Sequence, residues 1–139
     1  MSVAGKVVLI TGAGTGIGKA TADQLIAAGA HVVAGLFTEA ERDSAPRYPQ
    51  RLLDVRQQAD WDDAIAFCRK EFGGLDVLVN NAGILIEGTA EETTDETWDL
   101  ILDVNLKGLF RGCRSVIPEM RQGGGGVIVN LASIDALSG

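Results

Sequence analysis

Short apolar runs alternate along the chain with longer stretches in which apolar residues recur every three or four positions. Short continuous runs are typical of strands buried on both faces, whereas the three-to-four spacing is typical of helices. The pattern predicts strands over residues 6–10, 31–36, 51–53, 75–79 and 127–131. It predicts helices over residues 16–28, 58–72 and 94–121.

The order of these elements predicts the class of fold. Strands separated by helices favour a parallel sheet covered on both faces, because parallel strands need crossover connections. Residues 38–50 contain two prolines and mixed charge, so we expect a loop there with little room for a helix. We therefore predict an α/β fold with a doubly wound parallel sheet, of which residues 1–139 supply the first five strands as a single domain.

Two predicted helices carry apolar faces that matter for packing. The first is expected to bury Ile17, Ala20, Leu25 and Ala28 against the sheet. The last carries a wide stripe made of Trp98, Ile101, Leu102, Leu106, Leu109, Phe110, Cys113 and Ile117. This stripe could serve the internal core alone or also pack on a partner molecule, and the pattern leaves both alternatives open.

A glycine-rich loop, residues 11–18 with the sequence TGAGTGIG, joins the first predicted strand to the first predicted helix. Gly12 allows the turn, Gly16 allows phosphate groups to approach the backbone, and Gly18 allows the helix to pack closely. The P-loop and G-x-G-x-x-G spacings both fail here, because alanine or isoleucine stands at required positions. The strand–loop–helix arrangement predicts a cradle for the phosphates of a dinucleotide.

The chain resembles the short-chain dehydrogenase/reductase family, and the resemblance spans essentially all 139 residues. Five motifs occur in the family's order, beginning with T-G-x-x-x-G-x-G in the glycine loop. The others are Asp54-Val55 after the third strand, Asn80-Asn81-Ala82-Gly83 after the fourth, Asn105 within V-N-L-K-G, and Ser133 after the fifth. The resemblance implies that the doubly wound sheet is Rossmann-like.

The resemblance also implies roles for individual residues. Family members transfer a hydride between a nicotinamide cofactor and an alcohol or ketone, while a tyrosine moves the proton. By resemblance, Ser133 binds the substrate oxygen, Asn105 orders a water, and Asp54 contacts the adenine. No metal is expected. The implied cofactor-binding residues are Thr11, Gly12, Gly14, Thr15, Gly16, Ile17, Gly18, Leu36, Phe37, Asp54, Val55, Asn81, Ala82 and Gly83.

Purely structural interpretations exist for several of these residues. Asp54 could be a solvated acid at a strand end, Asn81 a turn former, and Ser133 an ordinary loop serine. Asn105 is harder to explain in this way, because asparagine is a poor helix former. Within a predicted helix it implies a bend or a bound water.

The family's Tyr-x-x-x-Lys would lie beyond Ser133, after which only six residues follow. The sole tyrosine, Tyr48, has no lysine at the required spacing. We therefore expect residues 1–139 to be the N-terminal portion of a longer dehydrogenase and to be inactive alone. The alternative is a non-catalytic dinucleotide-binding or scaffold protein. We expect residues 84–88 and 134–137 to line the substrate pocket.

The choice between NAD and NADP depends on the end of the second strand. An NAD site usually has an acid there, and an NADP site needs a cation for the 2′-phosphate. Residues 36–38 are apolar or neutral, the next acid is Glu39, and no Lys or Arg lies between Lys19 and Arg42. Thr15 stands where NADP enzymes of the family often have a basic residue. Because an uncompensated phosphate costs more than a missing acid, NAD is favoured.

Composition limits the partners. The net charge of −7 disfavours nucleic acid, and neither a membrane span nor a signal peptide is predicted. Cys68 and Cys113 lack metal-ligand spacing and are interpreted as small core residues in a reducing cytoplasm. The expected partners are a small alcohol or ketone substrate and further copies of the full-length chain, as a dimer or tetramer.

Overall fold

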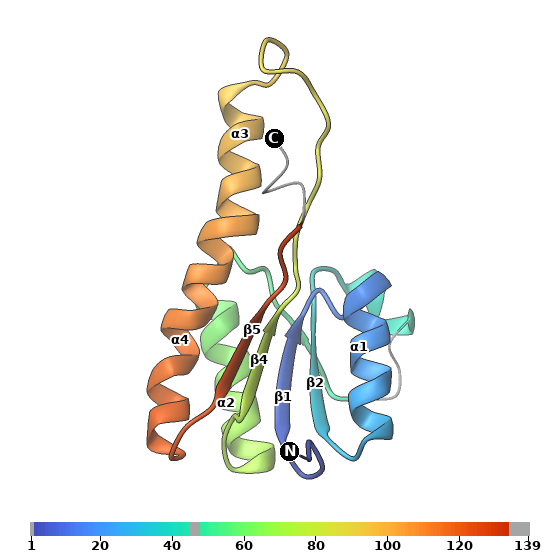
Figure 1. Ribbon diagram of the computed structural model, residues 1–139, viewed down its shortest axis with the longest axis vertical. Coiled ribbons are helices and arrows are strands. Elements are labelled where there is room, and N and C mark those ends of the chain that lie inside the picture. Colours follow the sequence, from blue (N-terminus) through green and yellow to red (C-terminus); the bar gives the residue numbers. More distant parts are fainter. Residues whose placement is uncertain (1, 45–47, 134–139) are drawn as a thin grey trace.

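A parallel five-stranded sheet forms the centre of the computed structural model, which describes residues 2–44 and 48–133 (Figure 1). The strand order is β3-β2-β1-β4-β5, which confirms the predicted doubly wound α/β fold. The direction of winding reverses beside β1, and α/β proteins bind ligands at such a reversal. The strands are β1 (Val7–Thr11), β2 (His31–Leu36), β3 (Gln50–Leu52), β4 (Val77–Asn80) and β5 (Val127–Asn130).

Helices cover the two faces of the sheet unequally. One face packs against α1 (Gly16–Ala27), and the other packs against α2 (Gln58–Phe72) and α4 (Leu109–Gln122) (Figure 1). The helix α3 (Asp95–Leu102) extends beyond the sheet and continues into α4. Gly73 ends α2 in the left-handed conformation, with a φ of +85°.

Residues of β1 alternate between two apolar clusters, because successive side chains of a strand point to opposite faces. One cluster lies under α2 and α4 and includes Val7, Leu9, Trp61, Cys68 and Val116. The other lies under α1 and includes Val8, Ile10, Ala22, Val32 and Leu36. Burial on both faces explains why the strand has no polar residue before Thr11.

The expected apolar face of α1 is wrong for three of its four members. Leu25 packs against the cluster under α1, but the structure leaves three residues exposed, namely Ile17, Ala20 and Ala28. The buried residues of the helix are Gly18 and Ala22. Because the helix approaches β1 closely at these two positions, the residues there are very small, and a search for large apolar side chains misses them.

The predicted continuous helix over residues 94–121 is also not uniform. Between α3 and α4 lies a π-helical segment, η2 (Asp103–Gly108), which contains Asn105. A π segment adds a residue to one turn and is frequent at functional sites. In addition, the predicted loop over residues 38–50 contains a short 3₁₀ helix, η1 (Glu39–Ser44).

The expectation of a sheet covered on both faces is wrong at β5. Ile128 packs on the cluster beneath α2 and α4. On the opposite face of β5, Val127 and Val129 are 53% and 44% exposed, since the helix on that face, α1, lies over β1 and β2 rather than over β5. The described residues therefore leave an apolar surface along this edge strand.

The two cysteines differ in environment. Cys68 is fully buried beneath α2, and burial raises the pKa of its thiol to about 12. Cys113 on α4 is only partly buried. In the part of the chain that the structure describes, no helix is long and apolar enough to span a membrane.

Candidate cofactor and active site

A cleft of about 680 Å³ opens at the carboxyl ends of β1, β2 and β4. It lies at the point where the winding of the sheet reverses, where the sequence predicts the dinucleotide site. Its lining is formed by Gly12, Thr15, Gly16, Ile17, Phe37, Glu41, Leu53, Asp54, Val55, Arg56, Asn81, Ala82, Gly83, Ile84, Leu100 and Val104.

The glycine loop has the shape that a bound phosphate requires. Gly12 and Gly16 adopt φ values of +63° and +54°, in the left-handed region that favours glycine. Gly16 begins α1, so the amide groups of the first helical turn and the helix dipole favour an anion there. Apart from its chain neighbours and the backbone of its own helix, no described residue places an atom within 4 Å of where a Cβ of Gly16 would lie. These residues fit the pyrophosphate of a dinucleotide.

Thr11 and Asn81 hold the loops after β1 and β4 together. The buried Thr11 hydroxyl accepts hydrogen bonds from the backbone amides of Asn81 at 3.0 Å and Ala82 at 2.9 Å. In return, the Asn81 side-chain amide donates to the carbonyl oxygens of Thr11 at 2.9 Å and Gly12 at 3.1 Å. The two residues thus fix the floor of the cleft through contacts within the chain.

Asp54 lies at the rim of the cleft and is paired with Arg56. The Arg56 guanidinium donates hydrogen bonds to both carboxylate oxygens of Asp54, the shortest being 2.6 Å. These bonds hold the pKa of Asp54 below its ordinary value, although partial burial acts in the opposite direction. Asp54 therefore stays ionised in the cleft, and the neighbouring Val55 is buried.

The two residues at the end of β2 are placed differently. Leu36 is fully buried in the cluster under α1, so only its backbone can face a ligand. Phe37 is 58% exposed, and its ring forms part of the cleft wall. Gly14 and Ile17 both belong to the glycine loop, but of the two only Ile17 lines the cleft.

Asn105 connects the π segment to the loop after β4. Its side-chain oxygen accepts a hydrogen bond from the amide of Ile84, and its side-chain nitrogen donates to the carbonyl of Ile84, both at 2.8 Å. Gly83 lies beside this contact, with its Cβ position 3.4 Å from the Asn105 oxygen. The irregularity that the sequence predicts at Asn105 is present as the π segment.

Ser133 is exposed and follows β5 by three residues. Because β5 lies beside β4, the serine emerges at the same edge of the sheet as the loop of residues 81–84. Of the residues expected in the substrate pocket, Ile84 lines the cleft, whereas residues 134–137 lie outside the described residues.

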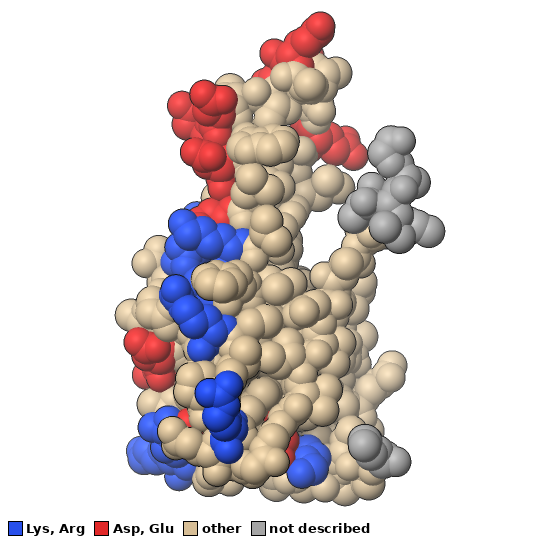
Figure 2. Space-filling view, turned by 60° about the vertical axis from the view of Figure 1, so that its left-hand side comes forward, with Lys and Arg blue, Asp and Glu red and all other residues tan. Residues whose placement is uncertain are grey.

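Charges on the outer face of α3 and α4 follow the polarity of the helices. Acidic side chains gather around α3, and basic ones gather along α4 (Figure 2). Asp95 and Glu96 lie in the first turn of α3, and Arg121 lies in the last turn of α4, which complements the helix dipoles. Within residues 2–44 and 48–133, no group of three or more His, Cys, Asp or Glu side chains is placed to hold a metal ion.

Comparison with known proteins gives the family. The sequence profile of the family described as "short chain dehydrogenase" matches residues 6–139. The chain belongs to the short-chain dehydrogenase family. The 3-alpha-(or 20-beta)-hydroxysteroid dehydrogenase of Mycobacterium bovis is 44% identical over 142 residues, which cover 97% of this chain and 54% of that protein. The 3-oxoacyl-acyl-carrier-protein reductase of Thermotoga maritima is 36% identical, over 100% of this chain and 60% of that protein.

Solved structures of this family superpose closely on the chain. The 3-ketoacyl-(acyl-carrier-protein) reductase of Brucella melitensis, complexed with NADH, gives a TM-score of 0.90 at 36% identity and covers 97% of this chain and 60% of that one. A short-chain dehydrogenase/reductase structure from Burkholderia xenovorans gives a TM-score of 0.92 at 34% identity, covering 97% and 58%. The chain thus spans a little over half the length of these family members.

Five cleft residues were missed by the sequence reasoning, namely Glu41, Leu53, Arg56, Leu100 and Val104. Leu100 and Val104 are four positions apart on one helical face, and this spacing could have indicated them. Arg56 follows Asp54 by two residues, a distance that allows the observed pairing. Glu41 had no comparable signal, because the 3₁₀ helix that carries it was predicted as a loop.

Proposed function

We propose that this chain is the cofactor-binding part of an NAD(P)-dependent oxidoreductase that acts on an alcohol or ketone. One observation carries the proposal: a glycine loop at the N-terminus of α1 opens into a cleft where the sheet reverses its winding. In this proposal residues 1–139 form a single, truncated Rossmann domain. Related dehydrogenases and reductases, including the protein complexed with NADH, support the assignment.

Each part of the cleft has a separate task in this proposal. The amide groups at Gly16 bind the pyrophosphate, and Asp54 accepts a hydrogen bond from the adenine. Asn105 positions the loop at Ile84, and Ser133 donates a hydrogen bond to the substrate oxygen. When bound, the nicotinamide would supply or accept the hydride. NAD is the proposed cofactor in preference to NADP.

Binding of the reduced cofactor by the intact protein tests this function. We expect NADH fluorescence to change on binding, and we expect Gly16→Asp to weaken binding at least about tenfold, because the new carboxylate repels the phosphates. Aspartate tolerates the left-handed backbone better than most residues, which limits misfolding. The matched control is Gly74→Asp, at a glycine between α2 and β4. Absence of NADH binding, or equal binding by both variants, would contradict the proposal.

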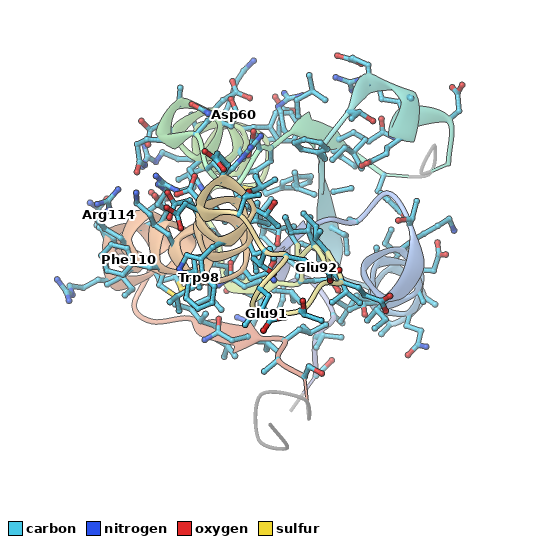
Figure 3. All side chains as sticks on the ribbon, turned by 90° about the horizontal axis from the view of Figure 1, so that it is seen from above. Asp60, Glu91, Glu92, Trp98, Phe110 and Arg114 are labelled. Atoms are coloured by element: carbon cyan, nitrogen blue, oxygen red, sulfur yellow. The ribbon has the colours of Figure 1, made fainter. Side chains whose placement is uncertain are left out.

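We also propose that the full-length protein self-associates through α3, η2 and α4. Five apolar side chains along these elements are 39–61% exposed, so the described core does not use them fully: Trp98, Leu102, Leu106, Phe110 and Ile117. Trp98 and Phe110 extend outward from the helices (Figure 3). Sedimentation should show a dimer or tetramer that Phe110→Glu dissociates. A monomeric unmodified protein would exclude this proposal.

A cytoplasmic location completes the proposed function. Cys68 and Cys113 are both free thiols, as is usual for proteins of reducing compartments. Fractionation of cells that express the intact protein should recover it with cytoplasmic markers, and recovery in a secreted fraction would argue against the proposal.

A further inference from the structure

NAD-binding sites of this fold usually have an acidic residue at the end of β2, and this chain has none there. Residues 36–38, at the end of β2, have no acidic side chain. The chain then turns into η1, where the amide of Glu41 donates to the carbonyl of Thr38 at 3.2 Å. This turn brings the Glu41 side chain back to the end of β2 and into the lining of the cleft.

Two contacts define the position of the Glu41 carboxylate. Its Oε2 accepts a hydrogen bond from the backbone amide of Phe37 at 2.9 Å. The same side chain lies directly against the glycine loop: the Cβ position of Gly14 is 2.6 Å from Glu41 Oε2 and 2.8 Å from Glu41 Cβ. The carboxylate therefore lies between the end of β2 and the phosphate-binding loop, where doubly wound folds place the adenosine ribose.

A carboxylate in this position favours hydroxyl groups over a phosphate. A 2′-phosphate needs backbone amides and a cation, and here the Phe37 amide is already bonded to an anion. Among the described residues that line the cleft, Arg56 is the only basic one, and its guanidinium is bonded to both oxygens of Asp54. An ionised carboxylate has about four acceptor positions on its two oxygens, so it can accept from several donors besides the Phe37 amide, ribose hydroxyls among them.

We propose that Glu41 selects NAD over NADP, by accepting hydrogen bonds from the ribose hydroxyls and by repelling the 2′-phosphate. This inference rests on the proposed function and assigns its cofactor preference to one side chain outside the β2 terminus. Gly14 is required for this position of Glu41, because a Cβ at residue 14 would occupy the space of the Glu41 side chain.

The test measures dissociation constants of NADH and NADPH for the intact protein by calorimetry, without turnover. The unmodified protein should bind NADH at least about tenfold more tightly than NADPH, because a like charge close to the 2′-phosphate is costly. Glu41→Gln keeps an acceptor and removes the charge. The ratio of the NADPH to the NADH dissociation constant should therefore fall by roughly tenfold, mainly through tighter NADPH binding. The matched control is Glu39→Gln on the same 3₁₀ helix, where the carboxylate pairs with Arg42. This control should leave the ratio unchanged.

A second variant keeps the test decisive if Glu41→Gln folds poorly. Gly14→Ala retains the glutamate but displaces it, so it should narrow the ratio in the same direction. A ratio that neither variant changes, or an unmodified protein that prefers NADPH, would overturn the inference. Either result would still leave the proposed role as a dinucleotide-dependent oxidoreductase in place. Failure to bind either dinucleotide would instead overturn the proposed function.

Discussion

Gly18 lies where the first turn of α1 meets the loop after β1. A Cβ at this position would overlap the carbonyl oxygen of Gly12 and the side-chain amide of Asn81. Asn81 in turn bonds the backbone of the glycine loop. A methyl group at residue 18 would therefore disturb the contact between two loops that form the floor of the cleft.

We expect Gly18→Ala to lower the free energy of unfolding by about 1–3 kcal/mol, the usual cost of overpacking. The measurement is urea denaturation of the intact protein. Gly74→Ala is a suitable control, because no described residue other than its chain neighbours places an atom within 4 Å of that Cβ position. Its effect should stay within about 0.5 kcal/mol, as at most surface positions. Equal stability of the two variants would show that the contact at Gly18 tolerates a side chain.

For single residues, the sequence was informative where a motif has a fixed spacing, as in the glycine loop of residues 11–18. The glycines of the loop were identifiable because their spacing reflects backbone geometry. Glu41 could not be found in this way, since its position depends on how η1 folds back toward Gly14. Leu36 shows the converse case: it was expected in the site by its place in the chain, but its side chain is fully buried.

Of the helical elements, the π segment η2 is the one whose side chain holds the loop after β4 in place. It places Asn105 so that both ends of the side-chain amide bond to the backbone of Ile84. The π segment η2 and the loop after β4 are thereby joined beside the cleft. The sequence indicated an irregular element through a poor helix former, but it gave no information on the partner 21 residues away.

Asn105→Ala should release this loop while leaving the helices formed. Loss of a hydrogen bond worth about 1 kcal/mol should speed amide hydrogen exchange at Ile84 several-fold. Lys107→Ala in the same segment removes a solvent-exposed ion pair with Asp103 and should leave that exchange unchanged. Unaltered exchange at Ile84 in Asn105→Ala would mean that other contacts hold the loop.

For the molecule as a whole, the strand order was predictable, whereas the coverage of the sheet was not. Apolar runs and glycine turns specify the parallel sheet, since each strand must be buried and each crossover needs a helix. The exposure of Val127 and Val129 depends on which helices cross each face. The continuous apolar run of β5 predicts burial on both faces, and it does not tell which residues would cover the second face, so the pattern alone did not identify this exposed surface.

Stability should also depend on acid pH through Asp76, which connects the start of β1 to the start of β4. Partial burial alone would raise the pKa of Asp76, but hydrogen bonds from the Val7 amide and from Lys6 outweigh it and lower the pKa. A lowered pKa in the folded state stabilises the protein above the ordinary pKa of aspartate. That stabilisation is lost as the pH falls through the folded-state value.

Asp76→Asn should therefore be less stable than the unmodified protein near neutral pH, and the difference should shrink as the pH is lowered toward 3. Urea denaturation at several pH values measures this convergence. Asp43→Asn, at an exposed residue of η1, is the control and should follow the unmodified protein throughout. If the free energies of unfolding of Asp76→Asn and the unmodified protein differed by the same amount at every pH, the lowered pKa of Asp76 would not be the source of the difference.

The full burial of Cys68 makes it a natural chemical reporter of global opening. A thiol with no exposed surface and a pKa of about 12 should resist thiol reagents while the core stays closed. In a Cys113→Ser background, the rate of labelling at Cys68 should rise with denaturant in parallel with global unfolding. Every variant above could then be ranked by how often its core opens, from one cysteine that the protein already contains.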